Sequence, residues 1–202
     1  MIRFLMLLAI LAGHAPAREP ILGGPCEGCE AVFEGRPAQP SNSARIAPPG
    51  EPGAPLLIEG RVTTLAGVPA AGIIVYAYHT DHTGIYPPVP GLTGAARRHG
   101  RLRAWARTDE QGRYGFTTIR PGAYPAGNIP AHVHLHVIEP GRGTYYIDDI
   151  LFADDPMLTA AQRRRMPGRG GPGIAQPSRD QDGLWRVRRD IVLGLDIPNY
   201  PR

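Results

Sequence analysis

The sequence contains no lysine, so arginine supplies its entire positive charge. The 22 basic residues outnumber the 18 acidic ones by four, and a net charge of +4 with only one basic loop is weak support for a nucleic-acid partner. We therefore expect none.

Charged residues are few, at 20%, whereas hydrophobic residues reach 42%, which is enough for a folded core. The 26 glycines and 23 prolines break helices, so a helical bundle fits the composition poorly. A length of 202 residues allows one domain or at most two small ones. The composition favours a loop-rich β architecture.

Cysteine is scarce: Cys26 and Cys29, spaced C-x-x-C, are the only two. Residue 30 is glutamate, which excludes the C-x-x-C-H haem-attachment pattern. The Pro/Gly flanks lack the strand and helix that surround a thioredoxin-type site, and a zinc ribbon would need a second C-x-x-C. We expect a local disulfide that pins the N-terminal segment, with half of a zinc site as the alternative.

The apolar run at residues 4–12 is too short to span a membrane. It follows Arg3 and precedes an Ala-Pro-Ala cleavage site that ends at residue 17, while His14 stands where a lipoprotein signal needs cysteine. We predict a signal peptide over 1–17 and a secreted or periplasmic protein with no stable membrane insertion after cleavage. An uncleaved anchor is the alternative.

Pro, Gly and Ser dominate residues 34–55, which are expected to be extended. The predicted organisation is therefore an N-terminal arm over 18–55, carrying the C-x-x-C motif, and one folded domain over 56–202. The domain opens with a strand, a turn and a strand whose alternation places Ile58, Val62 and Ile74 on inner faces.

Further alternating segments follow, separated by turn residues. Strands are predicted over 103–108, 113–119, 132–138, 144–152 and 183–195. A short helix over 157–166 has Thr159 as its N-cap. Roughly seven short strands at close spacing are typical of an all-β protein. We expect an antiparallel β-sandwich with long Pro/Gly-rich loops, or the related Greek-key barrel.

His132, His134 and His136 alternate along one predicted strand, so their side chains project from the same face. Imidazoles at positions i and i+2 can chelate one metal ion, and imidazole binds Fe, Cu, Zn and Ni. The alternative is a set of histidines that face solvent or are hydrogen-bonded in the core. For this spacing we favour the metal site.

Two tyrosines strengthen the metal hypothesis. Tyr86 follows a predicted strand, and Tyr124 lies just upstream of the histidines. A phenolate is a hard anionic donor that prefers a trivalent metal, and two phenolates with two imidazoles would neutralise most of a ferric charge. Each tyrosine alone is equally explained as an amphipathic loop residue.

Four stretches together resemble the intradiol ring-cleavage dioxygenases. They are EGRVTTLAGVPAAGIIVYAYHTDHTGIY, RTDEQGRYGFTTIRPGAYP, PAHVHLHV and ILFADDP, within residues 56–157. Their order matches the family's order of a first ligand tyrosine, a TD-x-x-G-x-Y-x-F-x-T-I-x-P stretch, a second ligand tyrosine and P-A-H-x-H. Each piece is weak alone, but all of them in order are specific.

The resemblance implies a β-sandwich that holds one non-haem Fe(III) by Tyr86, Tyr124, His132 and His134. It places Tyr124 and His134 in the axial positions. A small aromatic diol of the catechol type would displace Tyr124, which helps to take up its protons and is the catalytic residue. With O2 the ring opens between the two hydroxyl-bearing carbons, and the product is a muconate-type diacid.

The chain departs from the family pattern at two positions. Ile129 stands where family members commonly carry arginine, and Asp149 is the nearest counterpart of a frequent glutamine. Arg101, Arg103 and Arg107 are candidates for the missing positive charge.

Other chemistry-bearing residues are expected to be structural. Asp148-Asp149 and Asp154-Asp155 resemble paired catalytic carboxylates but equally suit strand ends and turns. The triplet at 163–165 suits a solvated helix end. We expect the remaining histidines to lie at the surface or a pocket rim. His136 is expected to be a solvated strand residue, with a pocket residue or one that supports the metal ligands as the alternative. Those remaining histidines are His79, His82 and His99.

Two alternatives come from other functional classes. The strand and turn pattern also resembles non-enzymatic prealbumin-like binding modules, which leave the histidines and tyrosines unexplained. A periplasmic Cu- or Zn-binding protein could use His132, His134 and His136. The Pro-rich arm offers a surface for packing on a second copy of the chain, so a homo-oligomer is an open alternative to a monomer.

Overall fold

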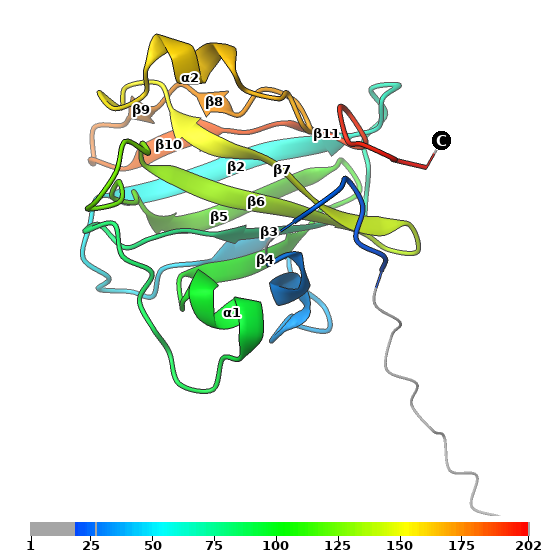
Figure 1. Cartoon of the computed structure of the whole chain (residues 1–202), viewed down its shortest axis with the longest axis horizontal. Coiled ribbons are helices and arrows are strands. Elements are labelled where there is room, and N and C mark those ends of the chain that lie inside the picture. The colour runs from blue at the N-terminus through cyan, green and yellow to red at the C-terminus, as the bar shows by residue number, and fades with distance from the viewer. Residues whose placement is uncertain (1–18, 27, 202) are drawn as a thin grey trace, which may run out of the picture.

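The computed structural model describes residues 19–26 and 28–201, and the predicted signal peptide lies outside these residues. Two β-sheets pack face to face, as the alternating sequence predicts (Figure 1). Among the described residues, no helix is long and apolar enough to cross a membrane.

The first sheet has the strand order β1-β5-β2-β10-β9, and β11 also pairs with β2. Its strands are β1 (Ser43–Arg45), β2 (Pro55–Thr63), β5 (Arg113–Ile119), β9 (Ser178–Arg179), β10 (Trp185–Arg188) and β11 (Ile191–Val192). The second sheet has the order β4-β3-β6-β7-β8. Its strands are β3 (Ile74–Tyr78), β4 (Arg103–Arg107), β6 (His132–Glu139), β7 (Gly143–Phe152) and β8 (Ile174–Ala175).

Most long pairs are antiparallel, which confirms the predicted sandwich, while parallel pairs join β1 to β5, β10 and β11 to β2, and β8 to β7. The strand predicted over 113–119 coincides with β5. The strand predicted over 183–195 is interrupted: β10 and β11 run along β2 in the same direction and register, but they are separated at Arg189 and Asp190, where the Asp190 side chain accepts the hydrogen bond of the Arg61 backbone N–H.

The inner faces of the two sheets form the main core. Ile58 and Val62 of β2 and Phe116 of β5 pack with Val133 and Leu135 of β6, and all five are fully buried. Because successive strand residues point to opposite faces, this packing turns the even-numbered residues of β6 outward. Those outward residues are the three histidines and Ile138.

A second layer covers the outer face of the β3-β4-β6-β7 sheet. The 3-10 helix η1 (Cys29–Phe33) and helix α1 (Gly94–His99) lie side by side there (Figure 1). Val32 of η1 packs with Tyr76 and Ile74 of β3 in a cluster separate from the main core. Ile74 is therefore buried as expected but on the outer face, because the N-terminal segment covers that face.

The N-terminal residues are held to the domain. Cys26 and Cys29 form the expected local disulfide. Residues 34–55, expected to be extended, include β1 along β5, and Ile46 and Ala47 reach the main core.

The helix predicted over 157–166 is shorter, since α2 spans Ala160–Arg164. Thr159 is its N-cap, as predicted, and forms a reciprocal capping box with Gln162.

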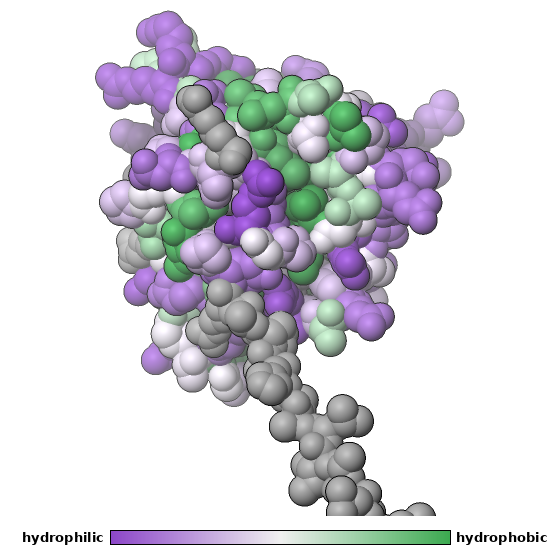
Figure 2. Space-filling view, turned by 90° about the vertical axis from the view of Figure 1, so that its right-hand side faces the viewer, coloured by the Kyte–Doolittle hydropathy of each residue, from purple (hydrophilic) through white to green (hydrophobic). Residues whose placement is uncertain are grey.

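A cavity of about 390 Å³ lies at the end of β6 remote from His132, next to Glu139, Leu193 and Tyr200. Figure 2 shows the end of the sandwich near the C-terminus, where apolar residues are interspersed with polar ones.

Gly60 tests the close approach of β2 to Arg189, at the interruption between β10 and β11. A Cβ at this position would collide with the backbone carbonyl oxygen of Arg189, which also accepts a 2.6 Å hydrogen bond from Tyr114. Gly60→Ala should lower the free energy of unfolding by about 1–3 kcal/mol, the usual range for overpacking. The matched control is Gly115→Ala on the paired strand, where the nearest atom is 3.4 Å away. Equal losses in urea denaturation of both variants would contradict this explanation.

Candidate metal centre

The site is built on the first residues of β6, the strand between β3 and β7. The register of β6 against β7 shifts between Val133 and Leu135, so a bulge lies at His134. His132 is 6% exposed, whereas His134 is half-buried. The strand thus fixes two imidazoles at its start and leaves one of them reachable from outside.

Four donor groups converge at this point. Tyr86 comes from the loop after β3, and Tyr124 comes from the loop after β5. The Tyr86 hydroxyl lies 2.7 Å from the Tyr124 hydroxyl and 2.8 Å from Nε2 of His134. Nε2 of His132 lies 3.0 Å from Nε2 of His134. The structure therefore brings together all four residues that the sequence analysis singled out as ligands.

The far side of each imidazole fixes its tautomer. Nδ1 of His132 lies 2.8 Å from the carbonyl oxygen of Pro130, which can only accept a hydrogen bond, so this nitrogen carries a proton. Nδ1 of His134 lies 3.1 Å from a carboxylate oxygen of Asp149, which assigns a proton there as well. In the neutral form of each ring, Nε2 is then the unprotonated nitrogen.

Two unprotonated ring nitrogens 3.0 Å apart, with two phenol oxygens beside them, form a set of donors that a bound cation would stabilise. Without a cation, the Tyr86 hydroxyl can donate to Nε2 of His134. A backbone carbonyl and a carboxylate behind the ligand histidines are the usual groups that orient them. The donor set, two phenol oxygens and two imidazole nitrogens, fits a hard trivalent ion.

Burial sets the charge state of these groups. It raises the pKa of Tyr86 far above its ordinary value, helped by the hydrogen bond and charge of Tyr124, and it also raises the pKa of Tyr124. Burial lowers the pKa of His132 and so favours its neutral form. Both phenols are therefore protonated without a cation, and a bound cation would favour their ionised form.

Asp149 supplies the negative charge beside the site. Burial acts to raise the pKa of its carboxyl, but the hydrogen bond from His134 and the positive charge that the neighbouring histidines carry when protonated lower it overall. The sequence pointed to Asp149 only as a departure from a family pattern, and its contact with His134 was not predicted. The contact could have been predicted from the pairing of the strand that carries Asp149 with the strand that carries the histidines.

Aromatic rings pack against one face of the His134 imidazole. Tyr78 stacks on His134 with ring centroids 4.5 Å apart and on His99 at 3.6 Å. His99 is 4% exposed, and its Nδ1 lies 2.9 Å from the Tyr76 hydroxyl. The expectation that His99 lies at the surface is wrong, because α1 carries it over the outer face of the sheet.

Two further histidine expectations fail for similar reasons. His79 is fully buried between the carbonyl of Thr80 and the hydroxyl of Thr118, and burial lowers its pKa to about 4. His136 is 4% exposed and lies against Cys29 instead of facing solvent, because the N-terminal segment covers it. His82 is exposed, as expected.

Two of the three arginines considered as replacements for the charge missing at Ile129 pair elsewhere, and the third, Arg107, is exposed at the end of β4. Arg101 pairs with Glu51 at 2.7 Å, and Arg103 donates to the carbonyls of Ala31 and Glu34. The side chain of Ile129 itself is 47% exposed.

The other acidic residues have structural roles. Asp154 pairs with Arg120, Asp155 accepts from the backbone of Ala131 and Met157, and Asp148 accepts from Gly168. Asp149 is thus the member of the two acidic pairs that touches the donor cluster. Of the triplet at 163–165, Arg163 and Arg164 form the last turn of α2, as expected of a solvated helix end.

Comparison with known proteins agrees with this geometry. The family model described as "Dioxygenase" matches residues 31–164, and the chain belongs to the intradiol dioxygenase family. It is 32% identical over 124 residues to the protocatechuate 3,4-dioxygenase beta chain of Burkholderia cepacia, covering 54% of this chain and 49% of the relative.

Other relatives give the same family. Catechol 1,2-dioxygenase 2 of Acinetobacter lwoffii is 28% identical over 148 residues, which cover 60% of this chain and 52% of the relative. The chain thus spans about half the length of these curated relatives. The family implies a metal cofactor, typically iron.

A solved structure supports the fold alone. The dioxygenase domain of a dioxygenase carbohydrate-binding protein fusion from Streptomyces sp. SirexAA-E matches with a TM-score of 0.58 at 23% identity. The match covers 80% of this chain and 94% of that one.

Asp149 should tune the metal affinity through His134. Asp149→Asn removes the charge but keeps a similar shape, so the hydrogen bond that the residue accepts from Nδ1 of His134 becomes weaker. Because that hydrogen bond orients His134 and makes its other nitrogen a better ligand, the metal affinity should fall by about 10- to 100-fold. Competition with a chelator measures this change. Asp180→Asn, at a remote turn, is the control and should bind as the unchanged protein does. An Asp149→Asn variant with unaltered affinity would show that the carboxylate does not act on His134.

Proposed function

We propose that the protein cleaves a catechol-type aromatic diol with O2, at a mononuclear Fe(III) held by Tyr86, Tyr124, His132 and His134. The product would be a muconate-type diacid that contains both oxygen atoms. The observation that carries the proposal is the convergence of two phenol oxygens on two imidazole nitrogens whose proton-free atoms face each other at 3.0 Å. Membership of the intradiol dioxygenase family supports it.

Fe(III) bound there would act as a Lewis acid that binds and orients the diol. His132 and His134 form the rigid part of the site, because each is fixed from behind by Pro130 or Asp149. Tyr86 is held by two contacts, one to Tyr124 and one to His134. These three side chains are suited to remain in place while a diol binds.

Tyr124 is suited to move. Its hydroxyl contacts only the Tyr86 hydroxyl among the hydrogen bonds described, and it lies on a loop between β5 and β6. Burial raises the pKa of Tyr124, so its phenolate oxygen, once released, readily takes a proton from the incoming diol. Tyr124 would thereby couple binding of the substrate to loss of a substrate proton.

The rival functions fit the geometry less well. A prealbumin-like binding module needs no convergence of donors. A site made of His132, His134 and His136 would require all three imidazoles in one cluster, but His136 groups with Cys26 and Cys29 while the other two group with Asp149. Location outside the cytoplasm stays a prediction, with which the Cys26–Cys29 disulfide agrees.

Tyr124→Phe tests the proposed role most sharply. Loss of the hydroxyl removes the proton acceptor and one anionic donor, so catechol turnover should fall by about 10²-fold or more. Oxygen uptake and the ultraviolet absorption of the muconate product measure the turnover. Tyr200→Phe is the control, since Tyr200 is similarly half-buried but lies in the cavity at the end of β6 remote from His132, and it should retain activity. Equal activity of Tyr124→Phe and the unchanged protein would overturn the assignment.

A further inference from the structure

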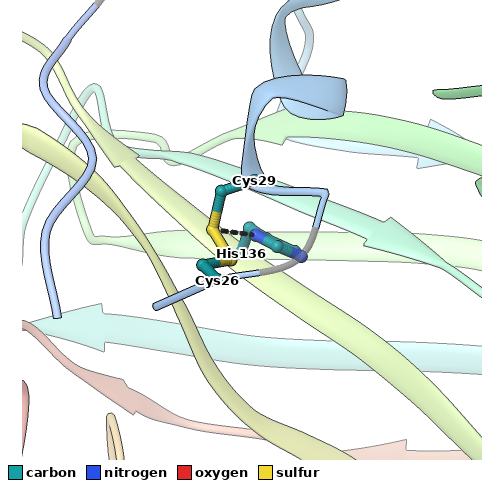
Figure 3. Close-up of side chains that lie close together, drawn as sticks. All are labelled: Cys26, Cys29 and His136. Carbon is teal, nitrogen blue, oxygen red and sulfur yellow. Dashed lines mark hydrogen bonds between the residues drawn. A yellow bond between two sulfur atoms is a disulfide. The ribbon is translucent and has the colours of Figure 1, made fainter. Parts of the chain in front are cut away.

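A second group of metal-binding side chains lies two residues along β6 from the donor cluster. Nδ1 of His136 is 3.6 Å from Sγ of Cys29, which is joined to Cys26 (Figure 3). The ligand atoms of these three residues all lie within 4.8 Å of one another. The disulfide therefore lies directly over a buried imidazole nitrogen.

The scaffold around this group is preformed. His136 is 4% exposed on β6, and Cys29 is fully buried at the start of η1. The Cα atoms of Cys26 and Cys29 are 5.6 Å apart. Because the folded sheet fixes His136 and η1 fixes Cys29, the three donor atoms would remain close together after the sulfur–sulfur bond is opened.

An entry path leads to the same atoms. A cavity of about 240 Å³ is lined by Cys26, His134, His136, Tyr146 and Asp149, among others. It is large enough for several water molecules, so a hydrated cation can reach Cys26 and His136. The carboxylate of Asp149 gives this cavity a negative charge that attracts cations.

We propose that, once the disulfide is reduced, Cys26, Cys29 and His136 bind one soft or borderline divalent cation such as Zn²⁺. A phosphine reductant takes an oxygen atom from water to become its oxide, the sulfur–sulfur bond breaks, and the two sulfurs receive the two protons. Cation binding then releases both thiol protons to solvent. The two thiolates neutralise the dication, and water from the cavity fills the fourth position, as in open Cys₂His zinc sites.

The two donor sets would select different metals. Phenolate oxygens suit a hard trivalent ion, whereas thiolates suit Zn²⁺ or another soft ion. The second site is assembled only after reduction, so the redox state of the C-x-x-C motif decides whether the protein takes up a soft cation. This proposal does not depend on the proposed dioxygenase activity.

Titration of the full chain with Cd²⁺, before and after treatment with a non-chelating phosphine under argon, tests the proposal. We expect thiolate-to-cadmium absorption in the ultraviolet only after reduction, and this absorption should saturate at about one additional Cd²⁺ per chain. Cys29→Ser should abolish the absorption, and His136→Gln should weaken binding by about tenfold or more. His82→Gln, which changes an exposed histidine remote from both donor groups, should leave both the absorption and the affinity unchanged.

Three outcomes would overturn the proposal. The first is a reduced chain with two titratable thiols that shows no thiolate–cadmium absorption. The second is His136→Gln binding Cd²⁺ as tightly as the unchanged protein does. The third is a disulfide that opens only when circular dichroism shows that the fold is lost, because the site requires the folded positions of His136 and Cys29.

Discussion

The site depends on the alternation of side chains along β6. Val133 and Leu135 point into the core between the sheets, which forces His132 and His134 onto the outer face. Pro130 and Asp149 then hold the outer nitrogens of the two rings, so the inner nitrogens face each other at 3.0 Å. The packing of β6 in the core thereby brings two imidazole nitrogens together as possible metal ligands. The loops after β3 and β5 place Tyr86 and Tyr124 beside them.

Much of the fold and the donor set could be predicted because both follow from local patterns. The alternation of apolar and polar residues predicted both ends of β5 and placed the ends of β6 to within one residue. Residues whose environment depends on distant chain segments could not be placed in this way. The helices η1 and α1 cover the outer face of the sheet and so bury His136, His99 and Ile74. No local sequence pattern predicts that these helices pack there. Asp149 meets His134 only through the pairing of β7 with β6.

The outer face of the second sheet carries two kinds of chemistry. Near the start of β6, the converging donors are oxygen and nitrogen atoms, among them the Tyr86 hydroxyl and Nε2 of His134. Two residues further along the strand, the Cys26–Cys29 disulfide covers His136. The ring of Tyr78 packs against His134, and the rings of Tyr78 and His136 also lie near each other. The covering N-terminal segment therefore both buries this face and supplies its sulfur atoms.

The central claim is that the four converging donors hold ferric iron and that a diol binds there. The visible spectrum and iron content of the purified mature protein, before and after anaerobic addition of catechol, test it most directly. The account predicts about one iron per chain and a broad tyrosinate-to-iron absorption that moves to longer wavelength with catechol. A colourless protein that stays free of iron after reconstitution would contradict it and leave a β-sandwich that binds by other means.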